Sequence, residues 1–207
     1  MENFAFDILA HSVFVNLTYV TFELLFVFFF CKGFVELVDG PRNKLVAFLR
    51  ENSLKGYPIL KCLSADGGKT WSEIFKTSMD SGHRPVAGFL ADGRVLVTYR
   101  YIPSGTQNLF AAFMSRETIE ATGRREQRVR IMPLDYDRNP SPDIGYTGWV
   151  QFEDGEIYIV NYIKDDADKA FIRGYSFFIF LLFCVCYNSI VNVDNLVIFI
   201  ECKFVAV

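Results

Sequence analysis

The chain has 207 residues, enough for one domain of ordinary size, and a formal net charge of −3. The lack of a basic excess argues against a nucleic-acid partner, and two histidines are too few for a histidine-rich metal site. Cys184 and Cys186 have the wrong spacing for a C-x-x-C redox or zinc motif. We predict neither a metal nor a cofactor.

The N-terminal region, residues 1–38, is apolar and rich in phenylalanine. Its run from Val13 to Cys31 is about as long as a membrane span, but Asn16 and Glu23 interrupt it. The β-branched and aromatic residues of this run would also suit buried strands. Both interpretations stay open, so a membrane contact is a candidate, and an extracellular or membrane-associated location is favoured over a cytoplasmic one.

A turn-rich stretch at residues 64–71 reads Ser-Ala-Asp-Gly-Gly-Lys-Thr-Trp and lies between two β-prone runs. Asp and Ser side chains bond nearby backbone N–H groups, and glycine accepts a positive φ. The stretch therefore predicts a hairpin loop, with Trp71 at its exit and mostly buried.

Two units in the middle of the chain repeat the pattern of apolar run, Asp-Gly turn and apolar run. Their turns, at Asp92 and Asp154, lie 62 residues apart. Asp-Gly between β-prone runs is a strong hairpin signal, and a hairpin repeated at such spacing favours propeller blades. Between the two units, residues 117–130 are charged and predict either a loop or a short helix.

The C-terminal region is apolar again. The run from Phe177 to Tyr187 is too short to span a bilayer, and one span over 177–200 would bury Asp194. The predicted organisation is an N-terminal flank over 1–38, a β domain over 39–175 and a C-terminal flank over 176–207.

The stretch at 64–71 resembles the Asp-box of the sialidase (BNR-repeat) family, with Ser64, Asp66, Gly68, Thr70 and Trp71 at the motif positions. Residues 59–175 also resemble the C-terminal part of a sialidase propeller. The stretches that carry this likeness are 82–100, 142–155 and 172–175. The resemblance implies an all-β fold, a partial six-bladed-type β-propeller of about three antiparallel blades.

The resemblance also implies a chemistry. In the family a Tyr nucleophile is activated by a Glu, an Asp serves as acid and base, and three arginines hold the carboxylate of an acidic sugar. The physical logic is sound, because a guanidinium pairs bidentately with a carboxylate and a phenol needs a base to become nucleophilic. Sialidases with a Tyr nucleophile depart from the usual pair of carboxylates.

Carried over by motif, Tyr146 matches the nucleophile and Arg100 matches a sugar-binding arginine. Arg84 stands where the family has its Glu, which removes the expected base, and Arg84 is instead a candidate for binding an acidic sugar such as a uronate. Arg173 and Arg138 are candidates for a further substrate-binding arginine. We expect Arg84, Arg100 and Tyr146 to face one cavity.

The N-terminal blades of the family, with their arginine and Asp acid, have no counterpart that the motifs identify. Asp137 and Asp143 lie near Tyr146 in sequence and are predicted to cap turns. The leading hypothesis is a sialidase-type exo-glycoside hydrolase fragment acting on or binding acidic sugars. The alternatives are a non-catalytic carbohydrate-binding or structural propeller piece, and a small membrane protein with a β domain. The sequence assigns no oligomeric state.

Overall fold

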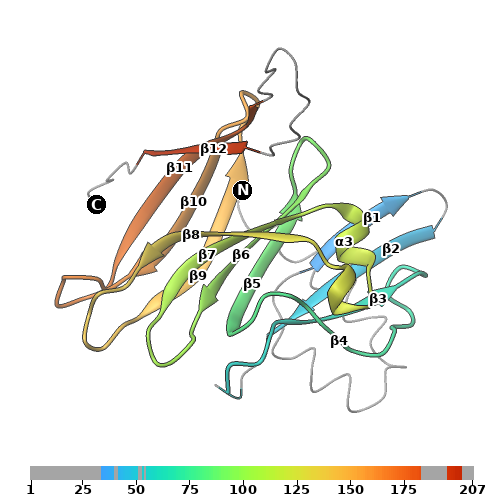
Figure 1. Ribbon diagram of the computed structural model, residues 1–207, viewed down its shortest axis with the longest axis horizontal. Helices are drawn as coiled ribbons and strands as arrows, with labels where there is room; N and C mark the ends of the chain where they lie inside the picture. The colour runs from blue at the N-terminus through green and yellow to red at the C-terminus, as the bar shows by residue number, and fades with distance from the viewer. Residues whose placement is uncertain (1–33, 40–41, 51–52, 54, 183–194, 202–207) are drawn as a thin grey trace, which may run out of the picture. The chain divides into compact units, whose positions relative to one another are not determined.

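The computed structural model describes residues 34–39, 42–50, 53, 55–182 and 195–201, and every strand in these ranges belongs to an antiparallel sheet (Figure 1). There are three four-stranded sheets in the described part of the chain, each built from consecutive strands. The chain divides between Tyr136 and Asp137 into two compact units. The all-β prediction is confirmed for the described residues.

The first sheet has the order β1-β2-β3-β4 and the second the order β5-β6-β7-β8; both lie in the first unit. The strands of the first sheet are β1 (Phe34–Asp39), β2 (Arg42–Leu49), β3 (Leu60–Ser64) and β4 (Phe75–Lys76). Those of the second are β5 (Gly82–Phe89), β6 (Val95–Tyr101), β7 (Asn108–Met114) and β8 (Val129–Tyr136).

These two sheets share one hydrophobic core. Alternate residues of a strand point to the same face, and Val46 and Phe48 on β2 pack with a row on the second sheet. The second sheet contributes Val95, Val97 and Tyr99 from β6 and Ala112 and Met114 from β7. The period-2 apolar pattern of the sequence therefore gives each sheet an apolar face, and these two faces pack against each other.

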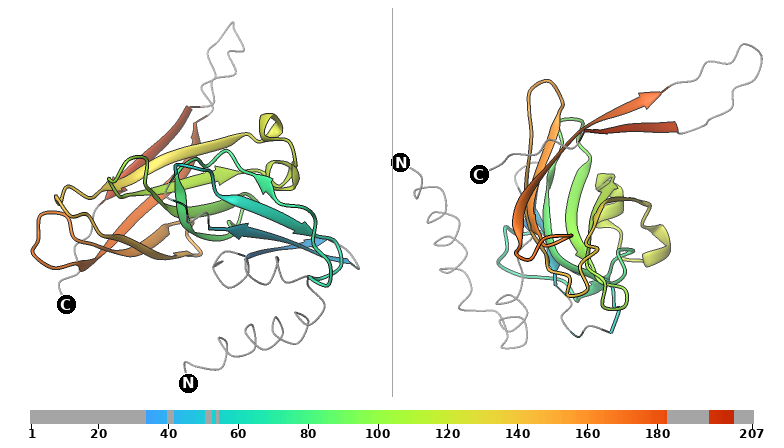
Figure 2. Two further views of the ribbon diagram at one scale, coloured as in Figure 1. Left: turned by 90° about the horizontal axis from the view of Figure 1, so that it is seen from below. Right: turned by 90° about the vertical axis from the view of Figure 1, so that its left-hand side faces the viewer.

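The third sheet forms the second unit, with the order β9-β10-β11-β12 (Figure 2). Its strands are β9 (Ile144–Gln151), β10 (Ile157–Ile163), β11 (Phe171–Leu182) and β12 (Asn195–Glu201). Strand β11 continues past residue 176 and pairs with β12. The sheets thus extend beyond both predicted boundaries of the β domain, because β1 begins at Phe34.

The two predicted Asp-Gly turns have the same geometry. Gly93 and Gly155 take left-handed φ values of 82° and 91°. Each glycine N–H donates to a carbonyl three residues back, at 2.9 Å from Leu90 and 3.0 Å from Phe152. Glycine accepts this conformation without a steric penalty. The repeat seen in the sequence is therefore a repeat of structure.

The charged segment after β7 contains the short helix α3 (Arg116–Glu120) and a single 3-10 turn, η2 (Arg124–Glu126). Ser115 caps α3 by accepting from the Thr118 N–H. Among the described residues, no helix has the length and apolar character needed to cross a bilayer. Residues 13–31, the candidate membrane segment, lie outside the described ranges.

Candidate functional site

Strands β5 and β9 carry the same irregularity, one in each unit. The register of β5 against β6 shifts between His83 and Val86, and Arg84 within this bulge has φ 53°. The register of β9 against β10 shifts in the same way, and Tyr146 there also has φ 53°. Arg84 and Tyr146 lie 62 residues apart, the spacing of the Asp-Gly turns. They occupy equivalent positions of the repeat.

A left-handed backbone at a non-glycine residue is uncommon and costs free energy. Bulges re-aim a side chain away from the regular alternation of a strand. Such strain collects at binding and catalytic sites, where the surrounding fold holds it in place. Arg84 and Tyr146, which the sequence analysis singled out, are thus the bulge residues of β5 and β9.

In the first unit, Arg100 on β6 lies directly opposite His83 on β5, one residue before the bulge. Its side chain is buried at 8% exposure, and Arg84 is half-buried. Both guanidiniums stay charged at any physiological pH. The second sheet therefore places two cations at the end of one strand pair.

In the second unit, Tyr146 is 55% exposed and its ring lies 6.0 Å from the ring of Tyr162 on β10. The Tyr162 hydroxyl donates to Asp143 Oδ1 at 3.0 Å. Tyr162 pairs with Gly145 across the strands, as Arg100 pairs with His83. Sequence analysis missed Tyr162, although alignment of the two repeats at their Asp-Gly turns puts it at the position of Arg100.

Asp143 and Asp137 have different roles. Asp137 caps turns as predicted: its carboxylate accepts from the backbone N–H groups of Asn139 at 3.0 Å, Asp143 at 2.8 Å and Asp165 at 2.9 Å. The Asp143 carboxylate instead accepts from the Tyr162 hydroxyl, a partner far away in sequence. The prediction that Asp143 caps a turn missed this contact.

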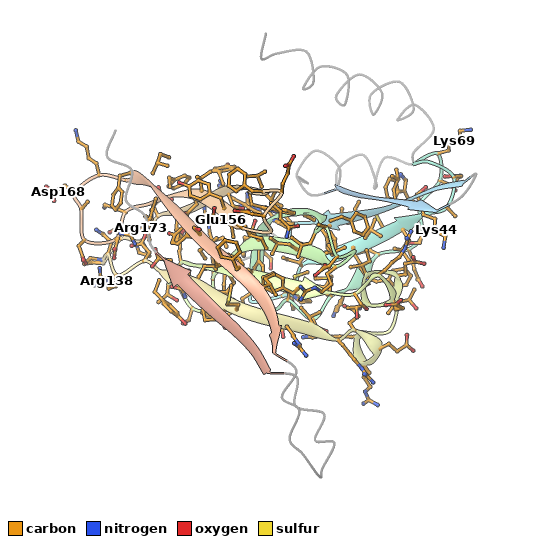
Figure 3. The ribbon with its side chains drawn as sticks, turned by 90° about the horizontal axis from the view of Figure 1, so that it is seen from above. Lys44, Lys69, Arg138, Glu156, Asp168 and Arg173 are labelled. Carbon is orange, nitrogen blue, oxygen red and sulfur yellow. The ribbon has the colours of Figure 1, made fainter. Side chains whose placement is uncertain are left out.

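Arg138 and Arg173, the candidates for a further substrate-binding arginine, bind the same carboxylate. Asp165 accepts from Arg138 Nε at 2.8 Å and Nη2 at 3.0 Å, and from Arg173 Nη2 at 2.7 Å. Figure 3 shows Arg138 and Arg173 close together at one end of the third sheet. The Arg173 guanidinium also lies 5.0 Å from the ring of Phe171.

The hydrogen bond from Arg138, followed by that from Arg173, holds the pKa of Asp165 well below its ordinary range. Asp165 is buried and has a left-handed φ of 46°. A sugar carboxylate at Arg173 would have to compete with this internal carboxylate. Arg173 is therefore not an open anion site.

The loop at 64–71 follows β3, and hydrogen bonds between its own residues fix its conformation. The Asp66 carboxylate accepts from the Thr70 hydroxyl at 2.6 Å and the Thr70 N–H at 2.9 Å. The Ser64 hydroxyl donates to Asp66 at 2.8 Å and accepts from the Gly68 N–H at 2.8 Å. These bonds, those of Thr70 first, lower the pKa of Asp66 to about 2.

Trp71 is partly buried, with the larger share of its surface covered, which agrees with the prediction that it is mostly buried. One side of it packs against the buried cluster of Ala47, Leu49 and Cys62, and the residue also lines a surface hollow. The indole N–H donates to the Gly68 carbonyl at 3.1 Å. The free-energy cost of Trp71→Ala is accordingly expected below the 3–5 kcal/mol or so of a fully buried aromatic.

We expect Ser64→Ala to lower the free energy of unfolding by about 2 kcal/mol, because it leaves a partly buried Gly68 N–H without its acceptor. Urea unfolding followed by circular dichroism measures this. Ser104→Ala, an exposed serine in another loop, is the matched control and should change little. Equal stability of the two variants would contradict the structural role of the Ser64 hydroxyl.

The described residues contain no group of three or more His, Cys, Asp or Glu side chains that could hold a metal ion. Arg84 and Arg100 belong to the first unit and Tyr146 to the second. That the three residues face one cavity stays a prediction.

No protein-family model matches the sequence, and no curated protein matches it. Among solved structures, the chain is similar to the intramolecular trans-sialidase from Ruminococcus gnavus in complex with oseltamivir carboxylate. The TM-score is 0.43 and the identity 23%, over 64% of this chain and 27% of that chain. It is also similar to the leech intramolecular trans-sialidase complexed with 2,7-anhydro-Neu5Ac prepared by soaking with 3'-sialyllactose. There the TM-score is 0.44 and the identity 20%, over 64% of this chain and 20% of that chain. The chain spans less than a third of either protein, and at this level of similarity its function has to be argued from its own residues.

Proposed function

We propose that this chain is a sialidase-like β-propeller fragment that binds an acidic sugar. The observation that carries the proposal is the repeated bulge, which puts Arg84 and Tyr146 in the same strained conformation at equivalent positions. The sialidase resemblance implies a functional residue at each of these positions, and this supports the proposal. The family resemblance and the left-handed backbone, which are independent of each other, thus both point to Arg84 and Tyr146.

The fold supports the propeller assignment through three meanders of four antiparallel strands. Four-stranded sheets arranged around an axis are the unit of a propeller. The loop at 64–71 adds the side-chain bonds of Ser64, Asp66 and Thr70, the conserved positions of the Asp-box it resembles. In a propeller, equivalent ends of successive blades turn toward one axis, where ligands bind.

Arg84 and Arg100 are the proposed carboxylate-binding residues. A guanidinium presents paired donors that match the two oxygens of a carboxylate, and such charge-assisted bonds are among the strongest hydrogen bonds. Arg84 stands on a bulge and Arg100 on the strand paired with it. Arg173 has a lesser role, because Asp165 already engages it.

Binding is favoured over turnover. Tyr146 is exposed, as a nucleophile must be, but the position of the family's base is occupied by the cation Arg84. Tyr162 in the same sheet donates its phenol hydroxyl to the Asp143 carboxylate. Displacement at a glycosidic carbon also needs a general acid, and no residue of this chain is assigned that role. We expect an acidic-sugar binder with little or no hydrolysis.

The test combines binding and turnover. Ligand-observed NMR with N-acetylneuraminic acid and glucuronic acid should show saturable binding, weakened roughly tenfold or more in Arg100→Gln. Arg94→Gln is the matched control, since Arg94 pairs with Asp92 inside an exposed turn. Absence of binding would leave only a structural propeller piece.

In the same preparations, an aryl sialoside and an aryl glucuronide should release no phenol. Robust hydrolysis that Tyr146→Phe abolishes would instead favour the second candidate function, a sialidase-type hydrolase. The exposed and strained position of Tyr146 is the observation in favour of that candidate.

A further inference from the structure

A hollow of about 450 Å³ opens in the first unit beside the loop at 64–71. Its walls come from β2, the loop and α3, and none of its residues belongs to the proposed acidic-sugar residues. Those that matter for its chemistry are Lys44, Leu45, Leu63, Ser64, Trp71 and Glu120. The hollow therefore has an aromatic and aliphatic wall and a charged rim.

The aromatic wall is held in place before any ligand arrives. The Trp71 N–H is fixed to the Gly68 carbonyl at 3.1 Å, and its ring packs against the cluster of Ala47, Leu49 and Cys62. Gly68 has φ 86°, and a Cβ there would lie 3.6 Å from the indole and 3.2 Å from Leu45. A preorganised ring binds at a lower entropic cost than a mobile one.

The charged rim offers one donor group and one acceptor group side by side. Lys44 Nζ lies 3.2 Å from Glu120 Oε2, and Arg116 Nε lies 3.3 Å from the other Glu120 oxygen. An ammonium has three donors and a carboxylate about four acceptor positions, so each keeps capacity for a ligand. Both side chains remain partly exposed, at 44% for Lys44 and 34% for Glu120.

We propose that this hollow binds one ring of a neutral sugar. A pyranose has an apolar face of C–H groups and an edge of neighbouring hydroxyls. The C–H face suits the negative face of an indole, and adjacent hydroxyls accept from Lys44 and donate to Glu120. A purely apolar ligand would remove water from the Lys44–Glu120 ion pair and offer no hydrogen bonds in its place. An anion would meet the Glu120 carboxylate.

The experiment uses the fact that the chain has two tryptophans. In Trp149→Phe, emission reports on Trp71 alone, and the wild-type chain is titrated in parallel. The probes are methyl galactoside, methyl glucoside, N-acetylglucosamine and, as the acidic comparison, N-acetylneuraminic acid. At least one neutral sugar should change the emission in a saturable way.

The rim variants Lys44→Met and Glu120→Gln should weaken that binding about tenfold or more, because each removes a hydrogen bond to a charged group. Lys69→Met is the matched control and should bind normally, because Lys69 is an exposed residue of the same loop that does not line the hollow (Figure 3). Arg100→Gln should also leave this binding unchanged, which separates this inference from the proposed function.

Three results would overturn the proposal. One is the absence of any saturable response to a neutral sugar in both the wild type and Trp149→Phe. Another is binding by both rim variants as tight as that of the wild type. The last is a response to N-acetylneuraminic acid alone, which would assign recognition to charge rather than to the sugar ring.

Discussion

Asp165→Asn is expected to destabilise the chain by about 3 to 5 kcal/mol at neutral pH, the usual cost of breaking a buried ion pair from one side. Asp165 is 4% exposed and accepts from both Arg138 and Arg173. Asparagine has nearly the same shape but no charge, so Arg173, only 14% exposed, would lose its ion pair with Asp165. The loss should appear as a lower urea midpoint of unfolding.

The effect of Asp165 should depend on acid pH. Its pKa is lowered in the folded chain, so its contribution is complete above the unfolded value of about 3.9 and is lost as pH falls below it. Wild type and Asp165→Asn should therefore converge in stability in acid. Asp166→Asn is the matched control: Asp166 also pairs with Arg138 but is 69% exposed, and its loss should cost little. Similar costs for both variants would contradict the account of this cluster.

Lys61 is expected to make the chain more stable as pH rises from about 8 to about 10.5. Its side chain is 1% exposed on β3, and Nζ donates to the Thr118 and Ile119 carbonyls at 3.2 and 2.6 Å. Burial lowers the pKa of Lys61 from 10.5 to about 8. Between these values the unfolded chain binds more protons than the folded chain, so the free energy of unfolding increases with pH.

The rise in the free energy of unfolding is at most about 3 kcal/mol, the free energy that corresponds to a pKa shift of this size. The Thr118 and Ile119 carbonyls favour the charged ammonium and so oppose the lowering of the pKa. Lys61→Met keeps the aliphatic volume and removes the titration. The difference in stability between wild type and Lys61→Met, measured by urea unfolding at several pH values, should grow in favour of the wild type across this window. A constant or falling difference would contradict the buried position of this ammonium.

The sequence predicted those parts of the molecule that depend on neighbouring residues. The turns at Asp92 and Asp154 follow from Asp-Gly between β-prone runs, and Ser64 and Asp66 bond backbone groups within a few positions. Period-2 burial in β10 follows from the alternation of its apolar residues. Each of these features needs no knowledge of a partner far away in the chain.

Contacts between distant residues were not predictable in the same way. The pair of Tyr162 with Asp143 spans 19 positions, and that of Arg138 with Asp165 spans 27. These contacts depend on strand register and on loops held by Asp137. Arg138 and Arg173 were candidates for a further substrate-binding arginine, and the fold pairs both with Asp165. The packing of Trp71 was predictable, but the hollow beside it was not, because Lys44 and Glu120 reach it from distant parts of the chain.

The repeated bulge lies between these two cases. The sequence showed a repeat of 62 residues, which already puts Arg84 and Tyr146 at matching positions. Their left-handed backbone follows only from the register shifts in β5 and β9, which are properties of the paired strands. Strain at both positions supports the functional role that we propose for them.

Titration of the chain with N-acetylneuraminic acid and with its methyl ester tests the proposed recognition of an acidic sugar most directly. The Glu120→Gln variant is used, so that the hollow beside Trp71 contributes little. The free acid is predicted to bind saturably in ligand-observed NMR, and the ester about tenfold or more weakly, because a neutral ester cannot form a charge-assisted pair with Arg84 or Arg100. Equal affinity for acid and ester, or no binding of the acid, would contradict it.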